Sequence, residues 1–283
     1  VDALQGLARA TGFPVLADPL SDCRFGPHVG TVPVCGGYDA YLGSEPVAEW
    51  GDPEVVVRFG ASPTSKPLRH YLRDADCQQF IVDPRGGWTE AEFTATDLLV
   101  AEPNGVAKAV TERVRDGCAP AWTERFRSAE ANHWETVERA LDGRYWEGGV
   151  LADVAALAPD PATVFVSNSM PVRDLDRFGR PRDANLTVIG NRGASGIDGI
   201  TSTALGAGSA TDDPLVLVTG DIAYYHDMNG LLALGRCNVD ATIVLIDNDG
   251  GGIFHMLPIE SHDRFESQFK TPHGLDFGPT GDL

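Results

Sequence analysis

Lysine is scarce in this sequence. Only Lys66, Lys108 and Lys270 occur among 283 residues, and arginine supplies the other positive charges, so 22 basic residues stand against 41 acidic ones and the net charge is −19. A surface of that sign repels phosphates, which argues against nucleic acid as a partner. The acidic residues are dispersed rather than gathered in a tail. This pattern is typical of a protein kept soluble in high salt, where screening relieves self-repulsion, so we expect a salt-loving source.

Paired cysteines and long apolar segments are also missing. The cysteines are five, widely spaced and without a C-x-x-C pair: Cys23, Cys35, Cys77, Cys118 and Cys237. This arrangement argues against a disulfide framework or a zinc site. No apolar run approaches the roughly 18 residues that span a bilayer, and the first residues lack a basic region. These absences predict a soluble cytoplasmic protein without a membrane partner.

Short apolar, β-rich runs alternate with helical patterns along the chain. Uniformly apolar strands separated by helices predict parallel sheets covered on both faces, so the fold class is α/β with two doubly wound domains. The predicted strands are Pro14–Ala17, Val55–Phe59, Gln79–Val82, Leu98–Ala101, Thr163–Ser167, Leu186–Ile189, Leu215–Thr219 and Thr242–Ile246. The predicted helices are Lys66–Arg73, Gly105–Val114, Ala121–Leu141, Ile197–Ser209 and Met228–Arg236. We expect a first domain over 1–118, a connecting helix within 119–150 and a second domain over 151–283.

Ligands of open parallel sheets bind beyond the carboxyl ends of the strands. Gly220–Ile222 follows one predicted strand, and Asp247–Gly252 follows the next. Asp221 and Asn248 lie 27 residues apart, one strand–helix–strand unit, so both side chains can reach one crevice. A carboxylate, an amide oxygen and a backbone carbonyl suit a small hard cation that also holds phosphate oxygens, and glycines let backbone amides approach a diphosphate. Asp and Asn after strands are also common turn residues, so the spacing alone leaves a plain turn open.

Several sequence blocks resemble thiamine-diphosphate-dependent enzymes. Gly220-Asp221 followed by Asn248 is similar to the GDG…NN motif of that family, with Ile222 and Asp247 where many members have Gly and Asn. Residues 167–174, 191–199, 226–230 and 250–258 resemble, more narrowly, the 2-succinyl-5-enolpyruvyl-6-hydroxy-3-cyclohexene-1-carboxylate synthases of menaquinone biosynthesis. The similarity is close over most of 160–275. It is looser over 1–150, where it rests on Val15–Ser21, Val57–Gly60 and Ser65-Lys66.

The resemblance implies a metal and a cofactor. Asp221, Asn248 and the Gly250 carbonyl would hold Mg²⁺ or Mn²⁺, which binds the diphosphate of thiamine diphosphate. The other residues implied to bind the cofactor are Asn168, Ser169, Gly196, Ile197, Gly220, Ile222 and Ile253. Ile197 would be the wedge that bends the cofactor, so that its own amino group can act as a base. Without the resemblance, Ile197 would be taken for a core residue.

The resemblance also implies two dianionic substrates, 2-oxoglutarate and isochorismate. The residues implied to bind them are Lys66, Arg173, Arg192, Phe254 and Leu257, and those implied in catalysis are Arg173, Arg192, Ser169 and Ile197. Arginine can bind carboxylates bidentately. Lys66 opens a predicted helix, where a lysine is electrostatically disfavoured, and this favours a functional role. Pro67 follows where relatives often carry another Arg.

Each of these residues also has a structural interpretation. Arg173 could pair with the neighbouring Asp174, Arg192 could be structural, and Phe254 and Leu257 could be core residues. His226, expected at a helix start, is interpreted as structural.

No segment of the chain resembles the first of the three domains of such enzymes, which supplies a glutamate to the cofactor. We therefore expect a fragment, truncated at its N terminus, incomplete at its C terminus and nearly inactive alone, whose parent is a homodimer or homotetramer. The parent would decarboxylate 2-oxoglutarate and add the succinyl group to isochorismate by 1,4-addition. An acetolactate-synthase-like carboligase is one alternative, which would not need both Arg173 and Arg192. A non-catalytic diphosphate-binding module is another. No G-x-G-x-x-G follows a strand, so a nicotinamide dehydrogenase fits poorly.

Overall fold

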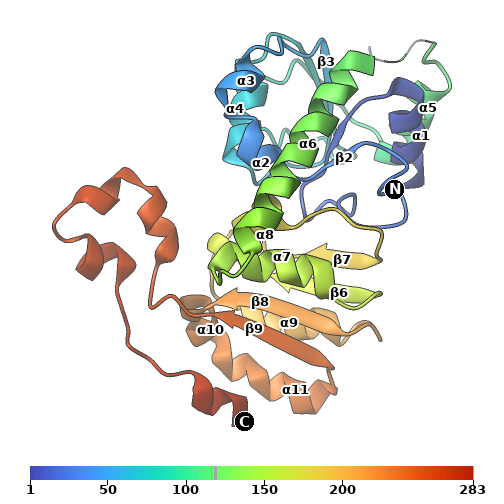
Figure 1. The fold of residues 1–283 in the computed structure, drawn as a ribbon. Coiled ribbons are helices and arrows are strands. Elements are labelled where there is room, and N and C mark those ends of the chain that lie inside the picture. The colour runs from blue at the N-terminus through green and yellow to red at the C-terminus, as the bar shows by residue number, and fades with distance from the viewer. Residues whose placement is uncertain (116, 118–119, 283) are drawn as a thin grey trace. The chain divides into compact units, whose positions relative to one another are not determined.

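The chain forms two compact units in a computed structural model that describes residues 1–115, 117 and 120–282 (Figure 1). Unit 1 comprises Val1–Gly149 and Asp176–Ala184, and unit 2 comprises Val150–Leu175 and Asn185–Leu283. Unit 1 is therefore discontinuous in sequence, because the chain leaves it after Gly149 and returns at Asp176. The expected boundary at 118/119 and Cys118 lie outside the described residues, so the domain limits stay a prediction.

Unit 1 contains two small parallel sheets. Strands β3 (Val55–Phe59), β4 (Gln78–Val82) and β5 (Asp97–Leu99) pair in that order, and β1 (Val15–Leu16) pairs with β2 (Val34–Cys35). The helices are α1 (Asp2–Thr11), α2 (Tyr38–Tyr41), α3 (Glu45–Ala48), α4 (Lys66–Asp74), α5 (Pro103–Thr111) and α6 (Pro120–Leu141). Helices α1 and α5 lie side by side through the buried side chains of Leu7 and Ala107 (Figure 1).

A buried carboxylate attaches α6 to the rest of unit 1. Glu130 accepts hydrogen bonds from the backbone N–H groups of Gly36 and Gly37, from the Tyr41 hydroxyl and from Trp134 Nε1, at 2.8–3.1 Å. The residue is only 8% exposed. Four donors satisfy both carboxylate oxygens and offset the cost of removing them from water.

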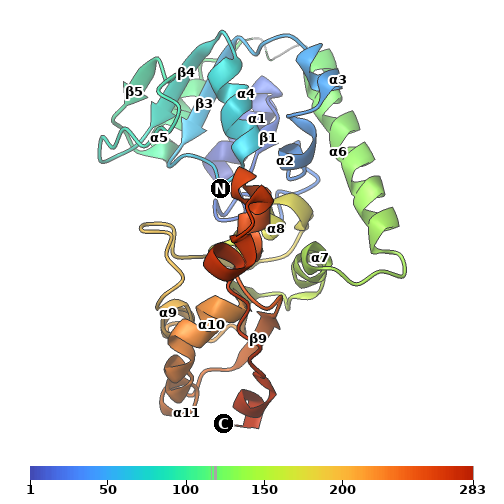
Figure 2. The same cartoon turned by 90° about the vertical axis from the view of Figure 1, so that its left-hand side faces the viewer.

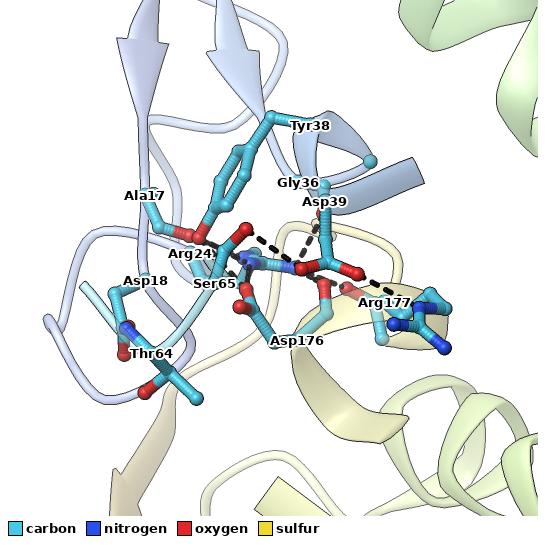
Figure 3. A network of polar contacts seen from close by, with 12 residues as sticks. Ala17, Asp18, Arg24, Gly36, Tyr38, Asp39, Thr64, Ser65, Asp176 and Arg177 are labelled. Carbon is cyan, nitrogen blue, oxygen red and sulfur yellow. Dashed lines mark hydrogen bonds and ion pairs between the residues drawn. The ribbon is translucent and has the colours of Figure 1, made fainter. Parts of the chain in front are cut away.

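A buried ion pair fixes the returning segment 176–184 within unit 1 (Figure 3). Arg24 is 0% exposed, and its Nη2 lies 2.7 Å from Asp176 Oδ1, which also accepts the Tyr38 hydroxyl at 2.7 Å. The guanidinium donates further to the backbone carbonyls of Ala17, Gly36, Asp176 and Gly179. Burial raises the pKa of Asp176 to about 7 despite the ion pair with Arg24, and its Oδ2 has no hydrogen-bond partner among the described residues.

Unit 2 is built on one parallel sheet with the strand order β7-β6-β8-β9. The strands are β6 (Ala162–Val166), β7 (Leu186–Ile189), β8 (Leu215–Gly220) and β9 (Ala241–Ile246). The helices, of which α7 begins and α8 ends in residues of unit 1, are α7 (Glu147–Leu157), α8 (Met170–Phe178), α9 (Ile200–Gly208), α10 (Asp221–Asp227) and α11 (Leu232–Cys237). Single helical turns at Met228–Leu231, Gly252–Met256, Pro258–Ser261, Glu266–Lys270 and Gly278–Asp282 complete the unit.

The core of unit 2 explains why its central strands are uniformly apolar. Helices α9, α10 and α11 lie on one side of the sheet and α7 on the other (Figure 2). Phe165 of β6, Leu205 of α9 and Leu217 of β8 pack in one buried cluster. Strand β6 is buried at every position and β8 at all but Gly220, as expected for central strands of a sheet covered on both faces.

The predicted α/β class with parallel sheets is confirmed, and all eight predicted strands are present. Three local predictions were wrong. The helix expected from Ile197 begins at Ile200, because Gly199 adopts a left-handed conformation (φ 66°) as its N-cap. The helix expected over 228–236 is a 3₁₀ turn followed by α11, and His226 lies in the last turn of α10 rather than at a helix start.

Several features of the described residues bear on the other expectations. Helices α1, α2, α3, α7, α8 and α10 and strand β2 were not predicted. The thiols of Cys23, Cys35, Cys77 and Cys237 are free.

None of the helices in the described part of the chain is both long and apolar enough to cross a membrane.

Candidate active site at the carboxyl edge of the unit 2 sheet

All four strands of unit 2 are parallel, so their carboxyl ends lie at one edge of the sheet. The chain turns from β6 to β7 on one side and continues with β8 on the other side of β6, which places the topological switch point between β6 and β8. Asn168 follows β6, and Asp221 follows β8. Ligands of open parallel sheets bind at such a switch point, so these two side chains mark the candidate site.

Asp221 begins α10 directly after β8 and is 3% exposed. Its Oδ1 accepts the backbone N–H of Ile222 at 2.7 Å, and its Oδ2 accepts that of Gly250 at 2.9 Å. His273 Nε2 also lies 3.1 Å from Oδ2. The His273 Nδ1 atom accepts the backbone N–H of Leu275 at 3.0 Å, so Nε2 carries the proton in the neutral ring and donates to Asp221. The carboxylate is therefore held in one orientation.

The side chains of Asp221, which follows β8, and Asp247, which follows the neighbouring strand β9, lie close to each other. The ligand atoms of Asp221, Asp247 and His273 lie within 4.8 Å of one another. Asn248, the predicted amide ligand, follows Asp247 in the loop after β9, and its part in the metal set stays a prediction. Carboxylate and amide oxygens are the ligands that Mg²⁺ and Mn²⁺ prefer, so the donor set fits the implied ion.

Gly250 allows the loop after β9 to close over this cluster. Its φ is 135°, and a Cβ at this position would lie 2.2 Å from the Lys270 carbonyl oxygen, so only glycine fits. The Gly250 N–H already bonds to Asp221 and the Gly251 N–H bonds to Lys270 O at 2.7 Å. The segment around 270–274 is thereby brought beside the loop, where Asp249 accepts the N–H groups of His273 and Gly274. The bond from Gly274 and then that from His273 lower the pKa of Asp249.

Asn168 joins the loop after β6 to the loop after β7. It is 2% exposed, and its Nδ2 donates to the carbonyls of Asn191 (2.8 Å) and Gly196 (2.6 Å), while its Oδ1 accepts Arg192 Nη1 at 2.7 Å. Three of the predicted site residues (Asn168, Arg192 and Gly196) are therefore in direct contact. The Gly196 carbonyl, expected to face the cofactor, accepts a hydrogen bond from Asn168 and has a second lone pair available.

Ser169 and Arg173 form a second local contact. Ser169 precedes α8 with a positive φ of 70°, and its carbonyl accepts Arg173 Nη1 at 2.6 Å. A serine in this conformation is strained, and the Arg173 bond stabilises the turn. The two predicted substrate arginines thus bond to adjacent residues, Arg173 to the carbonyl of Ser169 and Arg192 to the side chain of Asn168.

The apolar site residues have mixed surroundings. Ile197 is half-buried and packs against the core cluster of unit 2. Ile222, Ile253 and Phe254 are half-buried, and the Phe254 ring contacts Phe269 edge to face at 5.7 Å. Leu257 is 48% exposed.

Lys66 belongs to unit 1, where it is the first residue of α4. Its side chain is exposed and makes no ion pair or hydrogen bond with any residue that the structure describes. It lines an open groove of about 610 Å³ between α4 and the α2–α3 region, together with Leu42, Val47, Pro67, His70 and Tyr71. Lys66 is thus available to an anionic ligand.

Sequence reasoning missed the part that His273 plays. The segment 271–277 has no periodicity and matches none of the family motifs, so nothing in the sequence connects it to Asp221. Asp247 was noticed only as a departure from the motif, although its carboxylate points to the same cluster.

The model for the middle domain of thiamine pyrophosphate enzymes matches residues 1–166, which is more than half of the chain. The chain belongs to this family. Three similar proteins carry the name 2-succinyl-5-enolpyruvyl-6-hydroxy-3-cyclohexene-1-carboxylate synthase. They come from Haloarcula marismortui (75% identity over 99% of this chain and 48% of the relative), Natronomonas pharaonis (66% over 100% and 47%) and Halobacterium salinarum (62% over 99% and 47%).

The predicted resemblance to these thiamine pyrophosphate enzymes is confirmed. The chain spans about half the length of the curated relatives that it matches. The family match covers all of unit 1 up to Gly149, together with α7 and β6, whereas the candidate metal cluster lies beyond it in unit 2.

Proposed function

We propose that this chain is part of a synthase that joins a succinyl group from 2-oxoglutarate, with loss of CO₂, to isochorismate by 1,4-addition in menaquinone biosynthesis. The observation that carries the proposal is the cluster of Asp221, Asp247 and His273 at the carboxyl edge of a parallel sheet, in a chain of the thiamine pyrophosphate enzyme family. Asn248, the predicted amide ligand, follows Asp247 in the same loop. The names of the relatives support the choice of reaction.

Unit 2 would hold the metal and the diphosphate of the cofactor. Asp221 and Asn248, with the Gly250 carbonyl, would bind Mg²⁺ or Mn²⁺, and Asp247 lies close enough to contribute. His273 would keep the Asp221 carboxylate in its orientation. Asn168, Ser169 and the backbone at 220–222 would line the diphosphate, and Gly196, Ile197 and Ile253 would contact the rest of the cofactor. Thiamine diphosphate, when bound, supplies the electron sink that decarboxylation requires.

The arginines would hold the substrate carboxylates. A guanidinium has five N–H donors, and Arg192 uses Nη1 for Asn168, so other donors can bind a carboxylate. Arg173 would act beside it, with Phe254 and Leu257 as apolar contacts. Lys66 would bind the second substrate, isochorismate, for which its exposed ammonium is suited.

We further infer a cytoplasmic homo-oligomer that works in high salt. The halophilic sources of the three relatives and the net charge of −19 support the high-salt part of this inference. A middle domain, a connecting helix and a cofactor-binding domain would correspond to 1–118, 119–150 and 151–283.

The test is isochorismate consumption by the complete gene product in concentrated KCl with thiamine diphosphate, Mg²⁺ and 2-oxoglutarate. We expect turnover, and we expect Asp221→Asn to abolish it while weakening Mg²⁺ binding, measured by calorimetry, at least about tenfold. Asp240→Asn is the matched control, because this exposed aspartate lies before β9, at the opposite end of the strand. Consumption of pyruvate in place of 2-oxoglutarate would instead favour an acetolactate-synthase-like enzyme. Binding of cofactor without any turnover would favour a non-catalytic module.

A further inference from the structure

The Asp18-Pro19-Leu20 block and Ser65-Lys66 resemble the family motifs but come from distant parts of unit 1, and the structure connects them (Figure 3). Asp18 follows β1, where its Oδ1 accepts the Leu20 N–H at 3.0 Å and its Oδ2 accepts the Thr64 N–H at 2.9 Å. One carboxylate therefore fixes the loop after β1 against the loop that leads into α4.

A second carboxylate fixes the next residue. Asp39 of α2 accepts the Ser65 hydroxyl at 2.7 Å on Oδ1 and Arg177 Nε at 2.8 Å on Oδ2. Ser65 is the N-cap of α4, 2% exposed, and its hydroxyl oxygen accepts the Leu68 N–H at 3.1 Å. The hydroxyl thus donates to a carboxylate while it caps the helix, which strengthens both bonds.

These two contacts lie immediately before Lys66. A lysine at the first position of a helix faces the positive end of the macrodipole, which is electrostatically unfavourable. The carboxylates of Asp18 and Asp39 place two negative charges beside that end. Leu68 packs α4 into the buried cluster of unit 1, whereas the Lys66 ammonium at the start of the helix has no partner in the described part of the chain.

We propose that Asp18 and Asp39 are positioning residues for Lys66. They hold Thr64 and Ser65 so that the first turn of α4 presents the Lys66 ammonium to the groove in one orientation. Arg177 supports Asp39, and Pro67, with its fixed φ, limits the freedom of the turn on the other side. The inference rests on the proposed function, in which Lys66 binds the dianion isochorismate.

The test is a double-mutant cycle in the complete gene product. Asp18→Asn and Asp39→Asn should each raise the KM for isochorismate about tenfold, with kcat and the KM for 2-oxoglutarate changed less than twofold. In the Lys66→Ala background the same substitutions should raise that KM less than twofold further, because the residue through which they act is gone. Asp76→Asn, an exposed aspartate just after α4, should leave every constant unchanged.

Two results would overturn the inference. The first is a KM increase that persists in full in the Lys66→Ala background, since this would mean a structural effect unrelated to Lys66. The second is an unchanged KM in both aspartate variants.

Amide hydrogen exchange separates this inference from the proposed function. Exchange at Thr64 and Leu68 should be at least about tenfold faster in Asp18→Asn and Asp39→Asn, respectively, and unchanged in Asp76→Asn. If the unaltered protein does not consume isochorismate but this acceleration occurs, the anchoring of α4 stands and the role of Lys66 fails with the proposed function. Unchanged exchange in both variants refutes the anchoring itself.

Discussion

Replacing Arg24 with methionine should strongly destabilise unit 1. Methionine keeps part of the side-chain volume but removes every donor. Four backbone carbonyls, the Tyr38 hydroxyl and the Asp176 carboxylate therefore lose their Arg24 donor in a buried place, whereas the hydrogen bond from Tyr38 to Asp176 remains. Removing one partner of a buried ion pair costs about 3–5 kcal/mol, and we expect a loss of free energy of unfolding in that range. Arg24→Lys keeps the charge with only three donors for six acceptor contacts, so its loss should be intermediate.

The pH dependence of this decrease in the free energy of unfolding identifies its cause. The pKa of Asp176 is about 7, so its carboxyl is largely protonated in the unaltered protein at pH 5.5. Without Arg24 the pKa rises further, and keeping the carboxyl neutral at pH 8 then costs more. The loss should therefore be larger at pH 8 than at pH 5.5, by about 1 kcal/mol.

Tryptophan fluorescence makes the measurement specific to one unit. All five tryptophans (Trp50, Trp88, Trp122, Trp134 and Trp146) belong to unit 1, so urea unfolding followed by their emission in concentrated KCl reports on unit 1. Arg144→Met, at an exposed position, is the matched control and should change the free energy of unfolding by less than about 0.5 kcal/mol. A loss below about 1 kcal/mol for Arg24→Met at both pH values would refute the reasoning.

Two further predictions concern pH and salt. Asp176 has a folded-state pKa above its unfolded value of 3.8, so the folded state binds its proton more tightly, and the stability that this group contributes is lost as pH rises from about 4 to about 7. Over that range the free energy of unfolding of the unaltered unit 1 should fall relative to that of Asp176→Asn, which lacks this group; parallel pH profiles for the two proteins would contradict it. With a net charge of −19, the urea midpoint should also fall when KCl is lowered from about 1 M to about 0.1 M, because the screening length grows from about 3 Å to about 10 Å. A midpoint that does not depend on salt would disprove this explanation of the acidic composition.

Much of the architecture could be predicted because the strands are short apolar runs with polar borders. Strands β3 and β7 have the predicted bounds, and the parallel arrangement that follows from alternating strands and helices brings Asp221 and Asn248 to one edge. Helix ends were less predictable. The start of α9 depends on the left-handed conformation of Gly199, which a hydrophobic pattern does not encode.

The polar contacts that hold the site residues could not be predicted, because they join segments far apart in the sequence. Arg24 and Asp176 are 152 residues apart in the sequence. Because a charged residue is almost never fully buried unless it is paired, the burial of Arg24 could be predicted only by someone who already knew its distant partner. Thr64 and Asp18 are separated by 46 residues, and His273 and Asp221 by 52. Each contact depends on the completed fold rather than on a local pattern.

The return of the chain to unit 1 at Asp176–Ala184 has a consequence for synthesis on the ribosome. When the nascent chain has emerged only to Gly149, Arg24 has neither the Asp176 carboxylate nor the Gly179 carbonyl, and Asp39 has no Arg177. Arg24 and Asp39 therefore gain their ion-pair partners only after the ribosome has made residues that follow β6. A gene cut after Gly149 would leave the same cation without its carboxylate partner, so a piece meant to hold unit 1 must extend at least to Ala184 and must include β6.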